Sequence, residues 1–155
     1  MNIASLLAKK GVNVVTVGPR DTIREALKRL AQHNIGALVV VDGQGGLTGI
    51  VSERDIVRAL ARTEPARTEA ILTEPIDAIM TRNVIIGTPQ DDLVAAGTTM
   101  TERHIRHLPV MEGGRLVGII SIGDIVKAQR DHYQGEVDTL QIQLLNEEER
   151  SPRAS

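Results

Sequence analysis

Two serine–aspartate pairs are the residues of this sequence best suited to chemistry. Ser52 and Asp55 lie three positions apart, and so do Ser121 and Asp124. Each pair follows a glycine and two β-branched residues, in the stretches GIVSERD and GIISIGD. A strand that runs into a helix exposes free N–H groups that suit a phosphate, and a nearby carboxylate can accept both hydroxyls of a ribose. The two stretches therefore predict two nucleotide sites.

A helix cap is the alternative interpretation of each pair. A serine at the N-cap accepts a hydrogen bond from the backbone three residues on, and an acidic residue there bonds back to the N-cap N–H. Such a capping box needs no ligand. For one copy alone this alternative stays open, and the occurrence of two matched copies favours ligand binding.

The two stretches belong to a longer internal repeat. From Pro19 and Pro89 onward the copies run at a constant offset of 70 residues, which becomes 69 after the turn EGGR. Each copy has the pattern of a β-α-β-β-α unit, which is too small to bury its sheet alone, so we expect the two copies to pack on each other. The predicted fold class is α+β. The predicted segments are a first repeat at 2–62, a linker at 63–75, a second repeat at 76–130, a C-terminal helix at 131–150 and a frayed tail at 151–155.

Hydrophobic periodicity predicts the elements within each repeat. In the first copy we expect strands at 12–17, 37–41 and 47–51, and the second copy repeats the first of these at 84–86. A short helix leads each copy, with apolar residues at matching spacings. In the predicted C-terminal helix, Val137, Leu140 and Leu144 share one face, which indicates a docking or dimerisation helix despite Gly135.

Composition excludes several classes of partner. The 18 basic and 20 acidic residues leave a net charge of -2, and Tyr133 is the sole aromatic residue, so we expect no nucleic-acid partner. The absence of cysteine excludes a disulfide, a thiolate nucleophile and a cysteine metal site. No apolar run approaches the roughly 20 residues that cross a bilayer, and Met1 to Lys10 does not have the pattern of a signal peptide. We therefore expect a cytoplasmic protein without a membrane partner.

These motifs resemble the tandem cystathionine-β-synthase (CBS) domain pair, also called a Bateman module. The resemblance covers about Asn2 to Gln129 and rests on GIVSERDIV, GIISIGDIV and IRHLPV at 105–110. It implies two copies packed about a pseudo-two-fold axis, with two clefts for adenosine-containing ligands such as AMP, ADP, ATP, S-adenosylmethionine or NAD.

The resemblance also implies roles for individual residues. Asp55 and Asp124 would hold ribose hydroxyls, and Ser52 and Ser121 would lie near the ribose or the phosphate. The adenine slots would be shaped by Val14, Val84, Ala37, Leu38, Leu108 and Pro109.

The two clefts are expected to differ on the phosphate side. Arg106 and His107 stand where the resemblance implies phosphate-binding side chains, whereas the first copy has Gly36 and Ala37 at these positions. We therefore expect a cleft that combines Asp124, Arg106 and His107 to prefer phosphorylated ligands, because arginine offers a two-pronged grip on oxygens.

Charge on the first copy could partly compensate for this difference. Arg54 and Arg58, on the first turns of the helix after GIVS, are expected to supply positive charge from the other side of that cleft. Gly123, the counterpart of Arg54, leaves more room at the second site.

Two other interpretations concern the same basic residues. His104 and His107 are too loosely spaced for a metal site and no carboxylate cluster completes one, so no metal is expected. A surface ion pair is the alternative role for Arg106.

Three functional classes follow from these features. We favour a regulatory module, expected to be a homodimer, that senses adenine nucleotides and signals through an unknown effector protein or through self-association, since no effector domain is recognised. An enzyme is disfavoured because neither cleft offers a nucleophile with a positioned base or a Walker-type loop, so no catalytic residue is assigned. The third class is a structural dimer with empty clefts.

Overall fold

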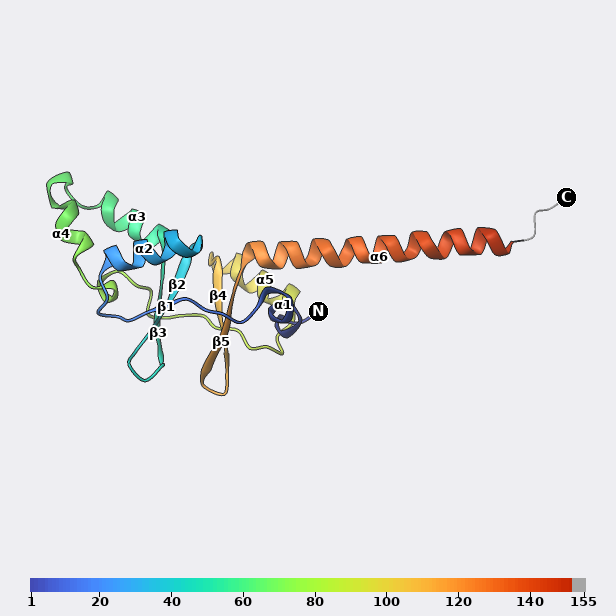
Figure 1. The fold of residues 1–155 in the computed structure, drawn as a ribbon, viewed down its shortest axis with the longest axis horizontal. Coiled ribbons are helices and arrows are strands. Elements are labelled where there is room, and N and C mark those ends of the chain that lie inside the picture. The colour runs from blue at the N-terminus through green and yellow to red at the C-terminus, as the bar shows by residue number, and fades with distance from the viewer. Residues whose placement is uncertain (152–155) are drawn as a thin grey trace.

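The computed structural model describes residues 1–151 and contains two mixed helix-and-strand halves followed by one long helix (Figure 1). The predicted α+β class with a C-terminal helix is confirmed. Of the tail predicted at 151–155, all but Ser151 lies outside the described residues. Among residues 1–151, no helix combines the length and the apolar character needed to span a membrane.

The first half forms a three-stranded sheet. Its elements are α1 (Ile3–Lys10), β1 (Thr16–Val17), α2 (Ile23–His33), β2 (Ala37–Val41), β3 (Leu47–Ser52) and α3 (Glu53–Ala61). Strand β1 pairs in parallel with β2, and β2 pairs antiparallel with β3. Thr22 caps α2 through its side chain, and Asn34 ends that helix in the left-handed conformation with φ 50. The apolar faces of α2 and α3 cover one face of this sheet.

The second half begins after a helical connection. The segment predicted as a linker contains η1 (Pro65–Arg67) and α4 (Thr68–Leu72) and leads to η2 (Ile76–Ala78). The later elements are α5 (Leu93–Glu102), β4 (His107–Glu112), β5 (Arg115–Ser121) and α6 (Ile122–Arg150). Strands β4 and β5 form a two-stranded antiparallel sheet.

The strand predicted at 84–86 does not form, and the strand predicted at 12–17 shortens to β1. In the second half, the parallel pairing is limited to one bridge, between Gly87 and Val110. Extension of this ladder would require a donated hydrogen bond from Pro109, which has no N–H. Val39 occupies the matching position in the first half and pairs with Thr16. The proline therefore explains why only the first half has a third strand.

Each repeat begins with a short leading segment, α1 in the first repeat and residues 76–80 in the second. Each leading segment packs into the core of the other half. The buried residues Ile3, Leu6 and Leu7 of α1 lie in the core of the second half. Ile76 and Met80 lie in the core of the first half. The backbone fixes this exchange, because the Ile3 N–H donates to the Asp91 carbonyl at 3.0 Å and the Ile76 N–H donates to the Asp21 carbonyl at 2.8 Å. The two halves are thus interlocked, and they meet along the line where ligand clefts are expected.

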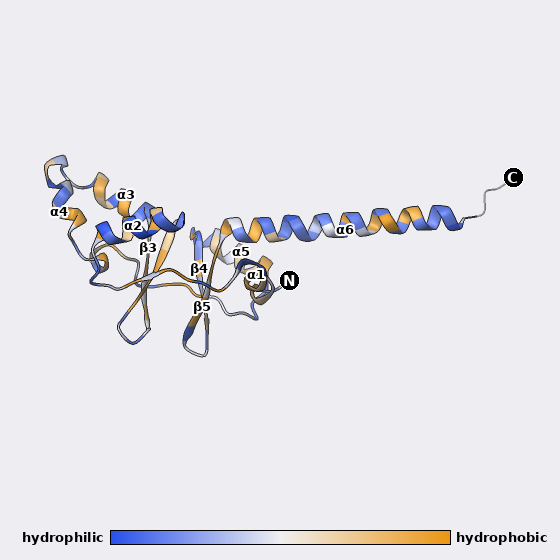
Figure 2. Cartoon of the chain, in the orientation of Figure 1, coloured by the Kyte–Doolittle hydropathy of each residue, from blue (hydrophilic) through white to orange (hydrophobic). Residues whose placement is uncertain are grey.

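The helix predicted at 131–150 is the outer part of α6. This single helix begins at the Ser121 cap and is continuous to Arg150. Every residue from 130 to 150 is exposed, and this part of α6 extends away from the body (Figure 1). Apolar residues occur along it as well as in the body (Figure 2).

Candidate functional site

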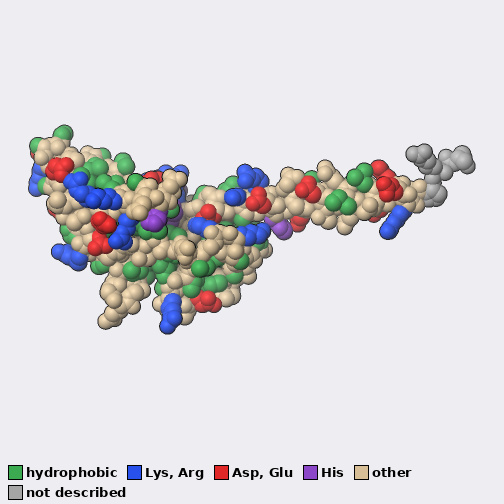
Figure 3. Space-filling model, in the orientation of Figure 1, with side chains coloured by type: hydrophobic (Ala, Val, Ile, Leu, Met, Phe, Trp, Pro, Cys, Tyr) green, Lys and Arg blue, Asp and Glu red, His purple; other side chains and the backbone are tan. Residues whose placement is uncertain are grey.

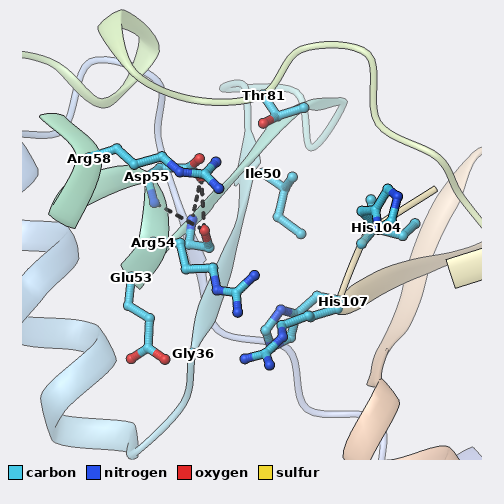
Figure 4. A pocket seen from close by; sticks show the side chains of 12 residues that line it. Gly36, Ile50, Glu53, Arg54, Asp55, Arg58, Thr81, His104 and His107 are labelled. Atoms are coloured by element: carbon cyan, nitrogen blue, oxygen red, sulfur yellow. Dashed lines mark hydrogen bonds between the residues drawn. The ribbon is translucent and has the colours of Figure 1, made fainter. Parts of the chain in front are cut away.

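A pocket lies between the two halves, at the end of β3 and the start of α3 (Figure 4). It has a volume of about 190 Å³. The first half contributes Gly36, Ile50, residues 52–55 and Arg58, and the second half contributes Thr81 and residues 104–107. Any ligand in this pocket would contact both repeats at once.

The first acidic group of the pocket is Asp55, which is held by a capping box with Ser52. Oδ2 of Asp55 accepts hydrogen bonds from the Ser52 N–H at 2.8 Å and from the Ser52 hydroxyl at 3.1 Å. The Asp55 N–H donates to Oγ of Ser52 at 3.3 Å. Among residues 1–151, no hydrogen bond reaches Oδ1 of Asp55. The cap thus fixes the side chain through one oxygen and leaves the other available for a ribose hydroxyl.

Positively charged side chains line the same pocket as this carboxylate. Arg54 and Arg58 extend from α3 toward the pocket, and His107 faces them from the second half (Figure 4). Arg106 completes the group. Within the described part of the chain, none of the three arginines forms an ion pair. Three guanidinium groups against the two carboxylates of Glu53 and Asp55 leave the lining with a net positive charge, which favours an anionic ligand.

Gly36 allows the second half to approach. A Cβ atom at this position would lie 3.3 Å from Cε1 of His107 and 3.5 Å from Oε1 of Glu53. The first contact is tight and the second is ordinary, so a side chain at Gly36 would require the imidazole to shift slightly. The residue that seemed to leave the first cleft poor in charge instead makes room for His107.

Burial lowers the pKa of His107 below its ordinary value of 6.5, and the positive charge of Lys10 lowers this pKa further. The negative charges of Asp124 and Glu53 oppose this effect without overcoming it. The imidazole is therefore mainly neutral at pH 7 and can become charged when an anion binds beside it.

The second serine–aspartate pair has the same cap and a different neighbour. Oδ2 of Asp124 accepts a hydrogen bond from the Ser121 N–H at 2.8 Å, and the Asp124 N–H donates to Oγ of Ser121 at 3.1 Å. In addition, Nζ of Lys10 lies 2.5 Å from Oδ2 of Asp124 and 2.7 Å from the Ile119 carbonyl. The ammonium group thus shares Oδ2 with the cap and places a positive charge of the same chain directly against this carboxylate.

The pKa of Asp124 reflects this contact. Partial burial raises the pKa of this carboxyl, but the hydrogen bonds from Lys10 and Ser121 and the charge of Lys10 hold it below its ordinary value of 3.8. Asp124 is therefore firmly ionised and already paired with a cation of the same chain.

The expected grouping of Asp124 with Arg106 and His107 is not the one that lines the pocket described above, and it stays a prediction for the second cleft. The pocket lining contains Arg106 and His107 together with Asp55, and does not contain Asp124. The backbone of His107 pairs with Ser121 in the second half, whereas its side chain lies against Gly36 of the first. The side chain therefore reaches the first half, while the charge of Asp124 also acts on it.

The residues predicted to shape adenine slots lie outside this pocket. Ala37, Leu38, Leu108 and Pro109 are buried in the two sheets, and Val14 and Val84 are half-buried in irregular segments. Their role toward an adenine ring stays a prediction.

The sequence analysis did not identify several lining residues as ligand-binding, namely Ile50, Glu53, Thr81 and Ile105, nor did it identify Lys10 beside Asp124. Thr81 reaches the pocket because its N–H and carbonyl pair with Ile50 of β3, at 2.9 and 3.0 Å. Lys10 reaches Asp124 because α1 packs on the second half. Both placements depend on the exchange of leading segments. No group of three or more metal-binding side chains occurs within residues 1–151.

Comparison with known proteins identifies the repeats. A sequence model of the CBS domain matches the chain twice, at residues 7–62 and 76–131. The CBS domain-containing protein YhcV of Bacillus subtilis is 37% identical over 75% of this chain and 79% of its own length. The crystal structure of the CBS-domain containing protein ATU1752 from Agrobacterium tumefaciens is similar, with a TM-score of 0.78 and 43% identity, over 83% of this chain and 99% of that chain.

Two similar solved structures contain adenosine compounds. The CBS domain protein PAE2072 from Pyrobaculum aerophilum, complexed with AMP, has a TM-score of 0.69 and 30% identity over 80% of this chain and 89% of its own. The CBS domain pair of protein MJ0100, in complex with 5′-methylthioadenosine and S-adenosyl-L-methionine, has a TM-score of 0.73 and 30% identity over 85% of this chain and 98% of its own.

Proposed function

Because the chain belongs to the CBS domain family, we propose that it is a regulatory module that binds an adenosine-containing nucleotide between its two repeats. One observation carries this proposal: the available oxygen of Asp55 shares a pocket with three arginines that have no acidic partner among the described residues. The AMP complex of PAE2072 and the adenosine compounds bound to MJ0100 support a ligand of this class.

The pocket suggests a role for each side chain. Asp55 accepts the ribose hydroxyls, and Arg54, Arg58 and Arg106 bind the phosphate oxygens, with His107 as a further donor. The volume of about 190 Å³ is below the roughly 300–1,000 Å³ usual for small-molecule sites. We therefore infer that ribose and phosphate fill the enclosed part, and that the adenine ring extends beyond it.

We further propose that the Asp55 site is the stronger of the two. This reverses the order expected from the sequence, which gave the Asp124 cleft the phosphate-binding residues. A ribose at Asp124 would compete with Lys10, whose ammonium bonds to both Oδ2 of Asp124 and the Ile119 carbonyl.

A ligand site shared by two repeats gives the ligand a way to change how the repeats are arranged. A ligand that contacts both repeats favours the relative arrangement to which it binds more tightly, and the coupling equals that difference in affinity. We propose that AMP, ADP, ATP or NAD acts in this way, and that the changed arrangement is read by a partner protein or through self-association.

A thermal-shift and calorimetric screen tests the proposal. Adenosine, AMP, ADP, ATP, NAD and S-adenosylmethionine are added to the full chain, and a ligand at about 100 times its Kd should stabilise it by roughly 2.7 kcal/mol. At about 2–4 °C per kcal/mol, the midpoint should rise by roughly 5–11 °C.

The matched variants are Asp55→Ala and Asp124→Ala, since both remove the acidic residue of the same capping box. We expect Asp55→Ala to abolish the shift and Asp124→Ala to retain it. Equal losses in the two variants would contradict the assignment to the Asp55 pocket. If no adenosine compound moves the midpoint, the structural-dimer class is favoured instead, and consumption of nucleotide during incubation would favour an enzyme.

A further inference from the structure

The outer part of α6 presents a continuous apolar stripe to solvent. Tyr133, Val137, Leu140 and Leu144 are 46–61% exposed. Their spacings of four, three and four residues are those of the a and d positions of a coiled coil. The helix that carries them leaves the body of the molecule (Figures 1 and 3). We call these four residues the α6 stripe.

A helix with such a stripe requires a covering partner. Most helical stability in proteins comes from packing of the apolar face, and isolated helices are marginal in water. Gly135, in the middle of the exposed part, weakens the helix further. The CBS match ends at residue 131, so the CBS repeats themselves do not account for the stripe.

The residues at each end of the stripe indicate the partner. Arg130 precedes Tyr133 by three residues and Glu147 follows Leu144 by three, so both continue the same heptad positions. In a parallel pair of copies, each of these charges would face its own like charge. In an antiparallel pair, Arg130 faces Glu147 of the partner subunit, Tyr133 faces the partner's Leu144, and Val137 faces the partner's Leu140. Opposite charges at both ends thus favour the antiparallel arrangement.

A lipid surface fits the same helix poorly. Interfacial helices carry basic residues on their polar face. The exposed part of α6 is instead acidic, with Asp131, Glu136, Asp138 and residues 147–149.

We propose that the α6 stripe is the dimerisation surface of this protein, where two copies pair antiparallel through their outer helices. This inference goes beyond nucleotide binding and does not depend on it. The pairing places the two nucleotide-binding bodies at opposite ends of a shared helical pair.

The first test compares two exposed residues on opposite faces of α6. Leu140 lies in the stripe and is 57% exposed, whereas Ile142 is 58% exposed and lies half a turn away. Light scattering should give the full chain at least twice the 16.8 kDa of one copy. Leu140→Lys should halve the wild-type mass, and Ile142→Lys should leave it unchanged. A monomeric wild type at tens of micromolar, or equal effects of the two variants, would overturn the proposal.

The second test determines the direction of the pair. The chain has no cysteine, so Tyr133→Cys and Leu144→Cys each introduce a single thiol. Under mild oxidation, an equal mixture of the two variants should form a disulfide-linked dimer that contains one copy of each. Each variant alone should remain uncrosslinked, since the equivalent positions of an antiparallel pair are about 16 Å apart along the axis. Crosslinking of each variant with itself would instead support a parallel pair and overturn the proposal.

Discussion

At the scale of single residues, Asp55 and Asp124 have the same helix cap and different cationic neighbours. Oδ1 of Asp55 is available beside three arginines, whereas Asp124 is already bonded to Lys10. The sequence predicted both aspartates as ribose-binding candidates from their spacing. The electrostatic difference was not predictable, because Lys10 is 114 residues from Asp124 and meets it only through the fold.

Arg106→Ala should weaken phosphorylated ligands and leave adenosine unaffected. A hydrogen bond to a charged group contributes about 1.5–3 kcal/mol, which corresponds to roughly a 10- to 150-fold rise in the Kd of AMP. Calorimetry with AMP and adenosine checks this expectation. Arg103→Ala is a matched control, since Arg103 is exposed at the end of α5 and outside the pocket lining. Equal weakening of AMP and adenosine would contradict a phosphate role for Arg106.

Lys10→Met should make the second site accessible. The substitution keeps the aliphatic part of the side chain and removes the ammonium that bonds to Asp124. The number of nucleotides bound per chain should rise from one toward two in calorimetry, with a stability change of at most about 1 kcal/mol, as is usual for an exposed ion pair. The double variant Lys10→Met with Asp124→Ala should return to one. An unchanged stoichiometry in Lys10→Met would show that this lysine does not restrict the site.

The lowered pKa of His107 predicts how the stability of the fold depends on pH. Because the folded state lowers the pKa of His107 below 6.5, the unfolded chain binds more protons in the window just below pH 6.5, and stability falls there as pH falls. The stability of His107→Gln should depend less on pH across this window than that of wild type. Urea unfolding at several pH values measures this, with His104→Gln as the control because His104 is exposed. Parallel pH profiles for His107→Gln and wild type would contradict the effect.

At the scale of elements, close contacts between β3 or β5 and the leading segments fix the two halves. A Cβ atom on Gly49 of β3 would lie 2.6 Å from Sδ of Met80 and 2.8 Å from the Thr81 carbonyl. On Gly118 of β5 its three nearest atoms would all belong to the side chain of Leu7, the first at 2.6 Å. A backbone carbonyl cannot move aside as the end of a flexible side chain can. An added Cβ atom is therefore tolerated less well at Gly49 than at Gly118.

Gly49→Ala should therefore destabilise the protein by about 1–3 kcal/mol, the usual cost of overpacking. Gly118→Ala should cost less, because Leu7 can change its rotamer. Gly43→Ala is the control, since no atom lies within 4 Å of its added carbon. Denaturant midpoints give the order, and a larger loss for Gly118→Ala than for Gly49→Ala would contradict the argument.

Most elements were predictable because their signals are local. The α2 stripe, the buried strand at 37–41, the β2–β3 hairpin and both capping boxes all follow from spacing and turn residues. The absence of a strand at 84–86 also had a signal in the sequence, because Pro109 of the neighbouring strand β4 cannot donate a hydrogen bond to a third strand. That signal was missed because valine and isoleucine favour strands and the repeat suggested an exact copy.

At the scale of the whole molecule, the candidate site depends on long-range placement of the two halves. The sequence predicted two packed repeats, and the CBS match confirms them. It did not predict which repeat receives each leading segment, nor that Arg106 and His107 face the other half. Both facts depend on contacts between residues that are far apart in the sequence, and no single stretch of residues carries a signal for such contacts.

The interlocked cores predict a single unfolding transition. Leu30 lies in the core of the first half and Met100 in that of the second. Leu30→Ala and Met100→Ala should each cost about 2–5 kcal/mol, and each should lower the midpoint of one common transition. Calorimetry distinguishes this from independent unfolding, in which each variant would shift one of two peaks and leave the other in place.

The exchange of leading segments also has a consequence for synthesis. The first core cannot close until Met80 has left the ribosome, although its strands and helices are complete by Ala61. Helix α1 emerges first, yet its backbone partner Asp91 appears more than half a chain later. The apolar face of α1 therefore stays uncovered during most of translation. Contacts between residues so distant in sequence form slowly, so the nascent chain is exposed to chaperones and to mispairing with neighbouring chains for longer than two self-contained repeats would be.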